Sequence, residues 1–405
     1  MEQTFKDSII NNKNDIMDKG KIKKVKKTKS FSIKKVVFSS LFIVALVIVA
    51  FDAMGLVHIF VFNNILSIVS YNKLELVAGS QVHTTSDGIF IANRSYISFI
   101  DKNRNEIFRH YYSMINPVIT ARGSYVAVIE NFGHIVHVYN TNGLVYTVDM
   151  GHSISSFSLS KNGYIALIAY NMGGYDIQVH NAHGMPFYGR HVDSFVSPVA
   201  VDISPDGIYI AISYIDINDA IVNSIIKFIH LDSNRLTYEN VDGVFAVSMY
   251  NPNQIIGKIH FVDNTRLVAI SSSRIFMVEP HNNANISWEI KLNNRINSIS
   301  IENNWFAVAY GSAFINHLGH EAGSINVYNM HGQKIFSPPL KHAQNMHSYQ
   351  DLLLVNNLYG FNIYNINNQN LVIQEIYAGD NFKLLGNDAI LEILGTNARI
   401  LHIGP

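Results

Sequence analysis

The histidines and the glutamate of one glycine-rich stretch are the residues whose types and spacing come closest to a metal site. His317, His320 and Glu321 lie within residues 310–323, and residues three positions apart share one face of a helical turn. Imidazole and carboxylate groups are ligands that Zn²⁺ accepts in proteins. Gly319 and the glycines that flank the stretch favour a flexible loop instead. We therefore assign no metal site to this stretch.

A second stretch, residues 214–220, brings two carboxylates close together in the sequence. Asp216 and Asp219 offer the oxygen ligands that Ca²⁺ prefers. Their spacing is not that of an EF-hand loop, so a solvated loop is the favoured interpretation. Neither a metal nor a cofactor is assigned here.

No sequence pattern of a common catalytic class occurs in the chain. The patterns G-x-x-x-x-G-K-[ST], H-E-x-x-H and G-x-S-x-G are all absent. The chain also has no cysteine, which excludes disulfides, thiolate metal sites and cysteine nucleophiles. Many of the 18 histidines fall in turns or strand-like phrases and are predicted to be structural: His137, His180, His183, His230, His331 and His402. The sequence therefore predicts no catalytic and no cofactor-binding residue.

Two recurring phrases predict the elements that would have to position any site. The first is a turn followed by an apolar strand with a small residue near its centre, as at 204–213. The second alternates apolar and polar residues and ends in a turn rich in Asn and Gly, as at 325–332. The central residues of the first phrase recur along the chain: Ala92, Ala127, Ala166, Ala211, Ala269, Ala307, Leu354 and Ile390.

A repeat of about 40 residues with four short strands in each unit predicts an all-β fold, a β-propeller at 73–405. Eight blades are favoured, and seven are the alternative if a weak copy is spurious. An open solenoid or two sandwiches fit the regular repeat less well. The last unit lacks an outer strand, so we expect residues 74–78 to supply it and to close the ring. The longest connection, at about 232–260, is expected to hold a long hairpin or loop.

The first 35 residues differ in charge from the rest of the chain. Residues 1–35 hold 11 lysines and four acidic residues, which gives +7, and the remainder holds 19 basic and 26 acidic residues, which gives −7. We expect residues 1–35 to be a disordered cytoplasmic tail. A patch for nucleic acid or anionic lipid is the alternative interpretation. No nucleic-acid partner is predicted.

An apolar segment follows the lysine-rich tail. Residues 36–51 carry no charge, and residues 36–56 form a 21-residue stretch. At about 1.5 Å per residue, such a helix crosses a hydrocarbon core of roughly 30 Å. The lysines place the tail in the cytoplasm. We therefore predict an uncleaved signal-anchor helix at 36–57 in the bacterial cytoplasmic membrane, and a juxtamembrane segment at 58–72. A cleavable signal peptide and a buried core helix are the alternatives.

With these features in view, the chain resembles an uncharacterised family of bacterial membrane-anchored β-propeller proteins of the quinoprotein-like and WD-repeat-like kind. The resemblance is carried by residues 36–56, the turn at 204–207 and the phrases that end in Tyr139-Asn140, Tyr328-Asn329 and Tyr364-Asn365. The Trp-Asp dipeptide of WD repeats is absent, because neither Trp288 nor Trp305 precedes an Asp. The tryptophan-docking phrase of quinoprotein dehydrogenases is missing too. The resemblance therefore implies the fold but no catalytic residue or cofactor.

The preferred functional interpretation is a binding or scaffold module rather than an enzyme. It would be tethered outside the bacterial cytoplasmic membrane, with an envelope protein or a ligand as its partner. One alternative is a propeller enzyme with metal or carboxylate chemistry at the central mouth, using Asp216, His317 and His320. Another is an envelope sensor that signals through the basic tail. For the propeller itself, function is expected in the connections between strand phrases.

Overall fold

The structure is a computed structural model that describes residues 67–216, 223–231, 244–250, 255–280, 284–292, 294–311, 324–338, 343–357, 360–376 and 381–404. The predicted tail (1–35), the predicted anchor (36–57) and residues 58–66 lie outside these ranges. Within them, no helix is long and apolar enough to cross a membrane. The signal anchor therefore stays a prediction.

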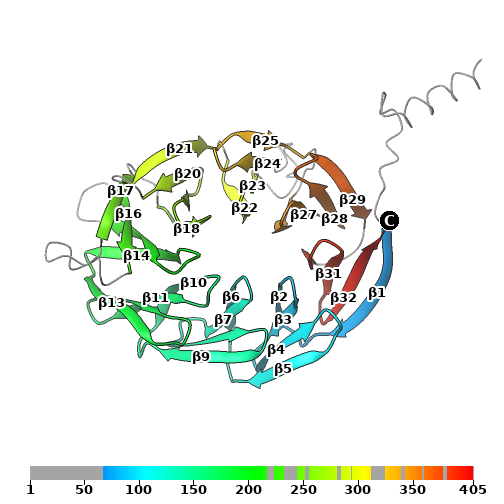
Figure 1. The fold of residues 1–405 in the computed structure, drawn as a ribbon, viewed down its shortest axis with the longest axis horizontal. Helices are drawn as coiled ribbons and strands as arrows, with labels where there is room; N and C mark the ends of the chain where they lie inside the picture. Colours follow the sequence, from blue (N-terminus) through cyan, green and yellow to red (C-terminus); the bar gives the residue numbers. More distant parts are fainter. Residues whose placement is uncertain are drawn as a thin grey trace, which may run out of the picture. The chain divides into compact units, whose positions relative to one another are not determined.

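The described strands form eight four-stranded sheets, and each sheet is one blade of a β-propeller (Figure 1). Numbered from the centre outward, the first strands are β2 (Gln81–Thr84), β6 (Pro117–Arg122), β10 (Ile154–Leu159), β14 (Val196–Ile203), β18 (Lys258–Phe261), β22 (Ile296–Ile301), β26 (Asn345–Tyr349) and β30 (Asn381–Leu384). The second strands are β3 (Gly88–Ala92), β7 (Tyr125–Glu130), β11 (Ile165–Asn171), β15 (Tyr209–Asp216), β19 (Leu267–Ile270), β23 (Trp305–Tyr310), β27 (Leu352–Asn357) and β31 (Ala389–Leu394).

The two outer rows complete the blades. The third strands are β4 (Tyr96–Asp101), β8 (Ile135–Asn140), β12 (Gly174–His180), β16 (Asn223–His230), β20 (Arg274–Glu279), β24 (Ser324–Asn329), β28 (Gly360–Asn365) and β32 (Asn397–Gly404). The fourth strands are β5 (Glu106–Tyr111), β9 (Gly143–Asp149), β13 (Pro186–Asp193), β17 (Val244–Tyr250), β21 (Asn285–Lys291), β25 (Lys334–Phe336), β29 (Asn370–Ile376) and β1 (Ser67–Glu75). The prediction of an all-β propeller with eight blades is confirmed. The connection at about 232–260 contains the fourth strand β17 and the start of β18.

The repeated apolar phrase forms the second strand of each blade. Its eight predicted central residues, from Ala92 to Ile390, are each at most 1 % exposed. Eight clusters of buried apolar side chains lie between the blades, one for each neighbouring pair. Each blade therefore needs both of its neighbours to bury its two faces, which explains why these strands are apolar on both sides.

The alternating phrase at 325–332 forms the third strand β24 and the turn after it, as the sequence predicted. Asn329 organises this turn, because its Oδ1 accepts hydrogen bonds from two backbone N–H groups of the turn at 3.0 Å. Gly332 has a φ of 74°, and a Cβ there would lie 2.7 Å from the indole ring of Trp288 in the preceding blade. The Asn and Gly of the phrase thus serve turn formation and packing between blades.

Strand β1 closes the ring by adding the fourth strand to the last blade (Figure 1). It pairs antiparallel with β32, from Ser67 opposite Gly404 to Glu75 opposite Asn397. The sequence predicted this closure but placed the strand too late, at 74–78. A partner for the eight residues of β32 has to begin earlier, because an unpaired edge would otherwise remain. Residues 67–72, which the sequence suggested were juxtamembrane, therefore belong to the blade.

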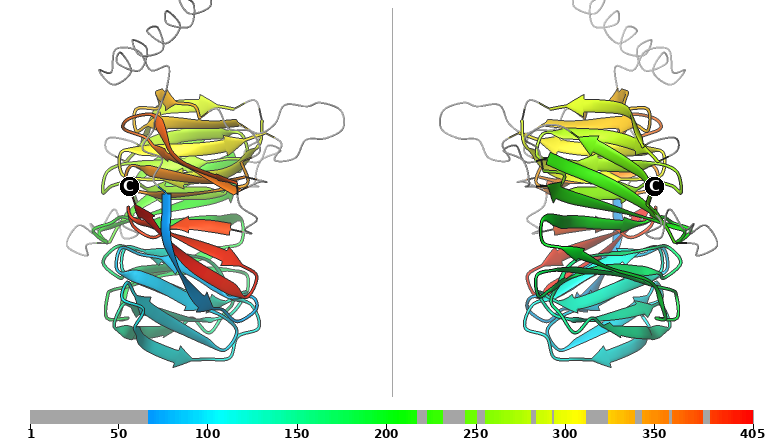
Figure 2. Two further views of the ribbon diagram at one scale, coloured as in Figure 1. Left: turned by 90° about the vertical axis from the view of Figure 1, so that its right-hand side faces the viewer. Right: turned by 90° about the vertical axis from the view of Figure 1, so that its left-hand side faces the viewer.

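The ends of the strands define two faces of the ring (Figure 2). We call turn face the side that carries the connections from first to second strands and from third to fourth strands. We call loop face the side that carries the connections from second to third strands and from one blade to the next. Since β1 is a fourth strand, its first residue, Ser67, lies at the turn face.

Candidate functional site

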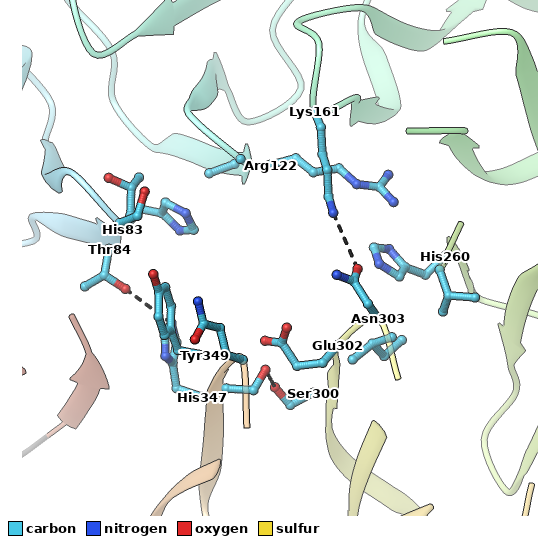
Figure 3. A pocket seen from close by; sticks show the side chains of 18 of the residues that line it. His83, Thr84, Arg122, Lys161, His260, Ser300, Glu302, Asn303, His347 and Tyr349 are labelled. Carbon is cyan, nitrogen blue, oxygen red and sulfur yellow. Dashed lines mark hydrogen bonds between the residues drawn. The ribbon is translucent and has the colours of Figure 1, made fainter. Parts of the chain in front are cut away.

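A pocket of about 530 Å³ opens at the turn face, where the first strands converge (Figure 3). Its wall is built from the first strands, and the turns that follow them, of the first three blades and the fifth to seventh blades. The chemically reactive side chains at its wall are His83, Arg122, Lys161, His260, Glu302 and His347.

A polar residue occupies the penultimate position of the first strand in seven of the eight blades. We call these seven residues the polar ring: His83, Ser158, Asp202, His260, Ser300, Ser348 and Lys383. Neighbouring members interact, since Ser158 donates its hydroxyl hydrogen to Asp202, and Ser300 donates to Ser348 at 2.7 Å. Only β6 has an apolar residue there, Ala121, and the residue after it is Arg122. The channel between the blades is therefore polar at its turn-face end.

Arg122 connects three blades at one side of the pocket. Its Nη1 donates to Asp202 Oδ1 at 3.0 Å and to the carbonyl of Ile203 at 3.1 Å, and its Nη2 donates to the carbonyl of Phe261 at 2.6 Å. Asp202 is 3 % exposed and also accepts a hydrogen bond from the backbone N–H of Phe261 at 2.6 Å. The buried guanidinium and the buried carboxylate thus balance each other's charge, and their hydrogen-bonding capacity is largely used.

Three basic side chains from three blades lie together at the opposite side of the pocket, and two of them, His83 and His347, line it. Lys383 Nζ donates to the carbonyl of Val82 at 2.5 Å, directly before His83 in β2. His347 Nδ1 accepts a hydrogen bond from the backbone N–H of Leu384 at 3.3 Å, and its Nε2 lies 3.4 Å from the hydroxyl of Thr84. These contacts hold the blade-7 histidine against the first and the last blade.

A lysine and a glutamate face each other across the middle of the pocket (Figure 3). Lys161 Nζ donates to the side-chain oxygen of Asn303 at 3.4 Å. Burial raises the pKa of Glu302, while a hydrogen bond from Ser348 and the charge of Lys161 act in the opposite direction. The middle of the pocket therefore contains one cation and one acid.

Three histidines at the pocket wall are neutral near pH 7. Burial lowers the pKa of His260 to about 4, although the charge of Asp202 acts to raise it. Burial, followed by the charge of Lys383, lowers the pKa of His83 to about 4. Burial, Lys383 and His83 together lower the pKa of His347 to about 3. Each ring therefore carries one N–H donor and one acceptor nitrogen.

Of the residues that the sequence suggested for metal or carboxylate chemistry, the structure describes Asp216, and Asp216 does not line this pocket. Asp216 is the last residue of β15 and lies at the loop face, away from the pocket. Asp219, His317, His320 and Glu321 lie outside the described residues. Among the residues that are described, no three His, Asp or Glu side chains are grouped closely enough to hold a metal ion. The structure thus does not bring Asp216 into the central mouth.

A second surface stands out at the loop face, on the first four blades. The five most exposed large apolar side chains of the described residues all lie there, in connections or at a strand end: Met172 91 %, Ile115 79 %, Phe132 77 %, Phe195 69 % and Tyr111 67 %. We call these five residues the apolar patch. Among the residues that the structure describes, the most exposed large apolar side chain at the turn face is that of Met185, at 56 %. Strong exposure of large apolar side chains is therefore concentrated at the loop face.

The loops that carry the apolar patch are well held. The Glu130 carboxylate accepts hydrogen bonds from the backbone N–H groups of Ile115 and Asn116 at 2.5 and 2.8 Å. The carbonyl of Phe132 accepts a hydrogen bond from the hydroxyl of Ser153 at 2.8 Å. Phe132 has a φ of 60°, a left-handed conformation that is rare for a bulky residue. Phe132 is thus an exposed aromatic residue held in a strained turn.

Sequence reasoning missed both surfaces. The pocket is built by the short first strands, which the repeated phrases did not identify. None of its three histidines, His83, His260 and His347, was among the histidines singled out from the sequence. A signal was present, namely the polar residue directly before the end of seven of the eight first strands. The apolar patch left no signal, because exposure of a single apolar residue in a connection is unremarkable in a sequence.

The fold and these surfaces define the chain as an eight-bladed β-propeller with a polar channel mouth and with exposed apolar side chains on part of the opposite face. Residues 61–380 match the model of a family described as a family of unknown function, DUF5711. The chain belongs to this family. The family description assigns no activity, and none of the curated proteins matches the chain.

Solved structures share the fold at low sequence identity. BamB from Moraxella catarrhalis is 13 % identical, with a TM-score of 0.51, and the match covers 84 % of this chain and 100 % of BamB. The Pan2 WD40 domain of Neurospora crassa is 9 % identical, with a TM-score of 0.47 over 84 % of this chain and 99 % of that domain. The Dos1 propeller is 11 % identical, with a TM-score of 0.49 over 84 % of this chain and 97 % of its own. At such identities the likeness to BamB concerns the fold alone.

Proposed function

We propose that this protein is a membrane-tethered binding module of the bacterial cell envelope, and that its apolar patch docks an envelope protein. The observation that carries the proposal is the concentration of the five most exposed large apolar side chains on one face. Full burial of one such side chain contributes about 1.5–3 kcal/mol to association. The ring supplies rigid support, because neighbouring blades share their cores.

The charge of the segments that carry the apolar patch favours a protein over the lipid surface as the occupant. Residues 111–116, 130–134, 171–173 and 193–195 include Glu130 and Asp193 but no lysine or arginine. Anionic lipid headgroups attract basic side chains, which these segments lack. The partner is expected to present aliphatic and aromatic side chains along an arc that spans the first four blades.

The tether is tested by the location of the C-terminus. A reporter that is active only outside the cytoplasm, fused after Pro405, leaves β1 paired with β32 and the ring closed. Activity is expected because the anchor directs everything after it to the outside. An inactive reporter on a stably expressed fusion contradicts the extracytoplasmic placement.

Docking at the apolar patch is tested by photo-crosslinking in intact cells. A photo-reactive residue replaces Met172 in the patch, and the matched control replaces Met185 at the turn face. We expect position 172 to yield one crosslinked protein and position 185 to yield none. The substitution Phe132→Asn is expected to reduce the yield from position 172 at least about five-fold, since it removes apolar contact area. Asparagine tolerates the left-handed conformation of the turn.

The outcomes of this experiment separate the possible occupants. Crosslinks to lipid, or only to a second copy of this chain, contradict the proposal of an envelope protein partner. Equal yields from both faces contradict the assignment of docking to the patch. An unchanged melting temperature of the Phe132→Asn protein is the control that the loss of crosslinking does not reflect unfolding.

A further inference from the structure

The charges around the turn-face pocket are balanced on one side and unbalanced on the other. Arg122 is paired with the buried carboxylate of Asp202. Lys161 acts on Glu302 across the pocket. Among the described residues, no carboxylate oxygen lies within ion-pair distance of Lys383 Nζ, whose contact is the carbonyl of Val82. Burial lowers the pKa of Lys383.

The two histidines beside Lys383 are neutral near pH 7 and bring no acid into the cluster. Burial, and after it the charge of Lys383, lowers the pKa of both His347 and His83. All three side chains are basic and come from different first strands, β26, β30 and β2. By contrast, Asp202 lies 3.7 Å from His260 on the other side of the pocket. The two basic ends of one pocket therefore differ in whether an acid accompanies them.

The hydrogen bonds of this cluster leave donors available. His347 Nδ1 accepts from the backbone N–H of Leu384, so the neutral ring carries its proton on Nε2 and donates it to the Thr84 hydroxyl oxygen at 3.4 Å. The Thr84 hydroxyl hydrogen therefore remains available to a ligand. Lys383 uses one of its N–H groups on the carbonyl of Val82. Both His83 and His347 line the pocket, and Figure 3 shows the His83 ring directed into it.

We propose that His83, His347 and Lys383, together with the hydroxyl of Thr84, form a binding site for a small oxyanion. The ligand is a sulfate-like or carboxylate group, held by N–H and O–H donors and by the charge of Lys383 behind them. A bound anion supplies the negative charge that the cluster lacks and favours the protonated form of Lys383. The site lies at the turn face, so it is independent of the docking proposed for the loop face.

The test is calorimetric titration of the full-length protein in detergent at pH 7.5. Sodium sulfate and sodium acetate are the probes, and sodium chloride at the same ionic strength is the reference. We expect saturable binding of at least one of the two oxyanions with a Kd of about 1 mM or tighter. The substitution Lys383→Met is expected to weaken it at least about ten-fold.

The matched control is Lys258→Met, because Lys258 also lies on a first strand but is accompanied by the charge of Asp202. Its affinity is expected to stay within about two-fold of the unmodified protein. A second variant, His347→Phe, removes the Nε2–H that orients the Thr84 hydroxyl and is expected to weaken binding at least about three-fold. It serves as the test if Lys383→Met does not fold. The absence of saturable binding of both oxyanions overturns the proposal, as does equal binding by the unmodified protein and the Lys383 or His347 variant.

Discussion

Replacing Arg122 with methionine is expected to lower the free energy of unfolding by about 3–5 kcal/mol, which is the effect of breaking a buried ion pair. The guanidinium hydrogen-bonds Asp202 and two backbone carbonyls in two other blades. Without the guanidinium, the Asp202 carboxylate, which is 3 % exposed, stays buried with no positive charge as close to it. The expected loss is measured by urea unfolding at pH 7.5.

Arg266→Met is the matched control for the Arg122 prediction. Arg266 pairs with Asp263 at 2.7 Å within one surface turn, and exposed pairs of this kind contribute about 0–1 kcal/mol. In the Arg122→Met background, Asp202→Asn is expected to recover part of the loss, because it removes the unpaired charge. Equal destabilisation by Arg122→Met and Arg266→Met contradicts the role assigned to the buried pair.

Lowering the pH from 6.5 toward 4 is expected to destabilise the propeller steeply. In the folded chain the pKa values of His83 and His260 are about 4, and that of His347 is about 3. In the unfolded chain they return to about 6.5, so the unfolded state binds more protons throughout this window. The contribution of the neutral rings is complete above pH 6.5 and is lost as the pH falls. Each ring accounts for up to about 1.4 kcal/mol per pH unit.

The pH prediction is checked by urea unfolding at pH 7, 6 and 5. His347→Gln is expected to flatten the dependence by up to about 1.4 kcal/mol per pH unit, because glutamine does not titrate. His183→Gln changes an exposed histidine in a turn and is expected to leave the slope unchanged. Identical slopes for the unmodified protein and the His347→Gln variant contradict the prediction.

The two faces of the ring have different proposed binding partners. The loop face offers apolar contact area, which suits association with another protein. The turn face offers a polar pocket, and the charge of Lys383 at one side of it, which no carboxylate balances, favours a small anion. The Arg122 network and the closing strand β1 hold the blades that build the pocket. A substitution at one face should therefore leave binding at the other face unchanged, since the residues that define the two faces lie at opposite ends of the strands.

Local patterns in the sequence were enough to predict the blades and their number. A strand buried on both faces must be apolar at successive positions, and a third strand followed by a tight turn needs Asn and Gly. Residues such as Ala211 and Asn329 therefore report their environment through their immediate neighbours. Ring closure was predictable for the same reason, because the last repeat lacked a strand. Its start at Ser67 was not, since the length of the pairing depends on β32 at the other end of the chain.

The sites were decided by the tertiary structure alone. Thr84 and His347 are 263 positions apart in the chain, and their contact exists only because the ring closes between the last and the first blade. The first strands that bring them together are short and mix polar with apolar residues, so no periodic pattern marks them. The sequence by itself thus determined a closed ring with eight blades favoured. The position of each blade in that ring determined which basic side chains share a pocket. It also determined which of these side chains have an acid beside them.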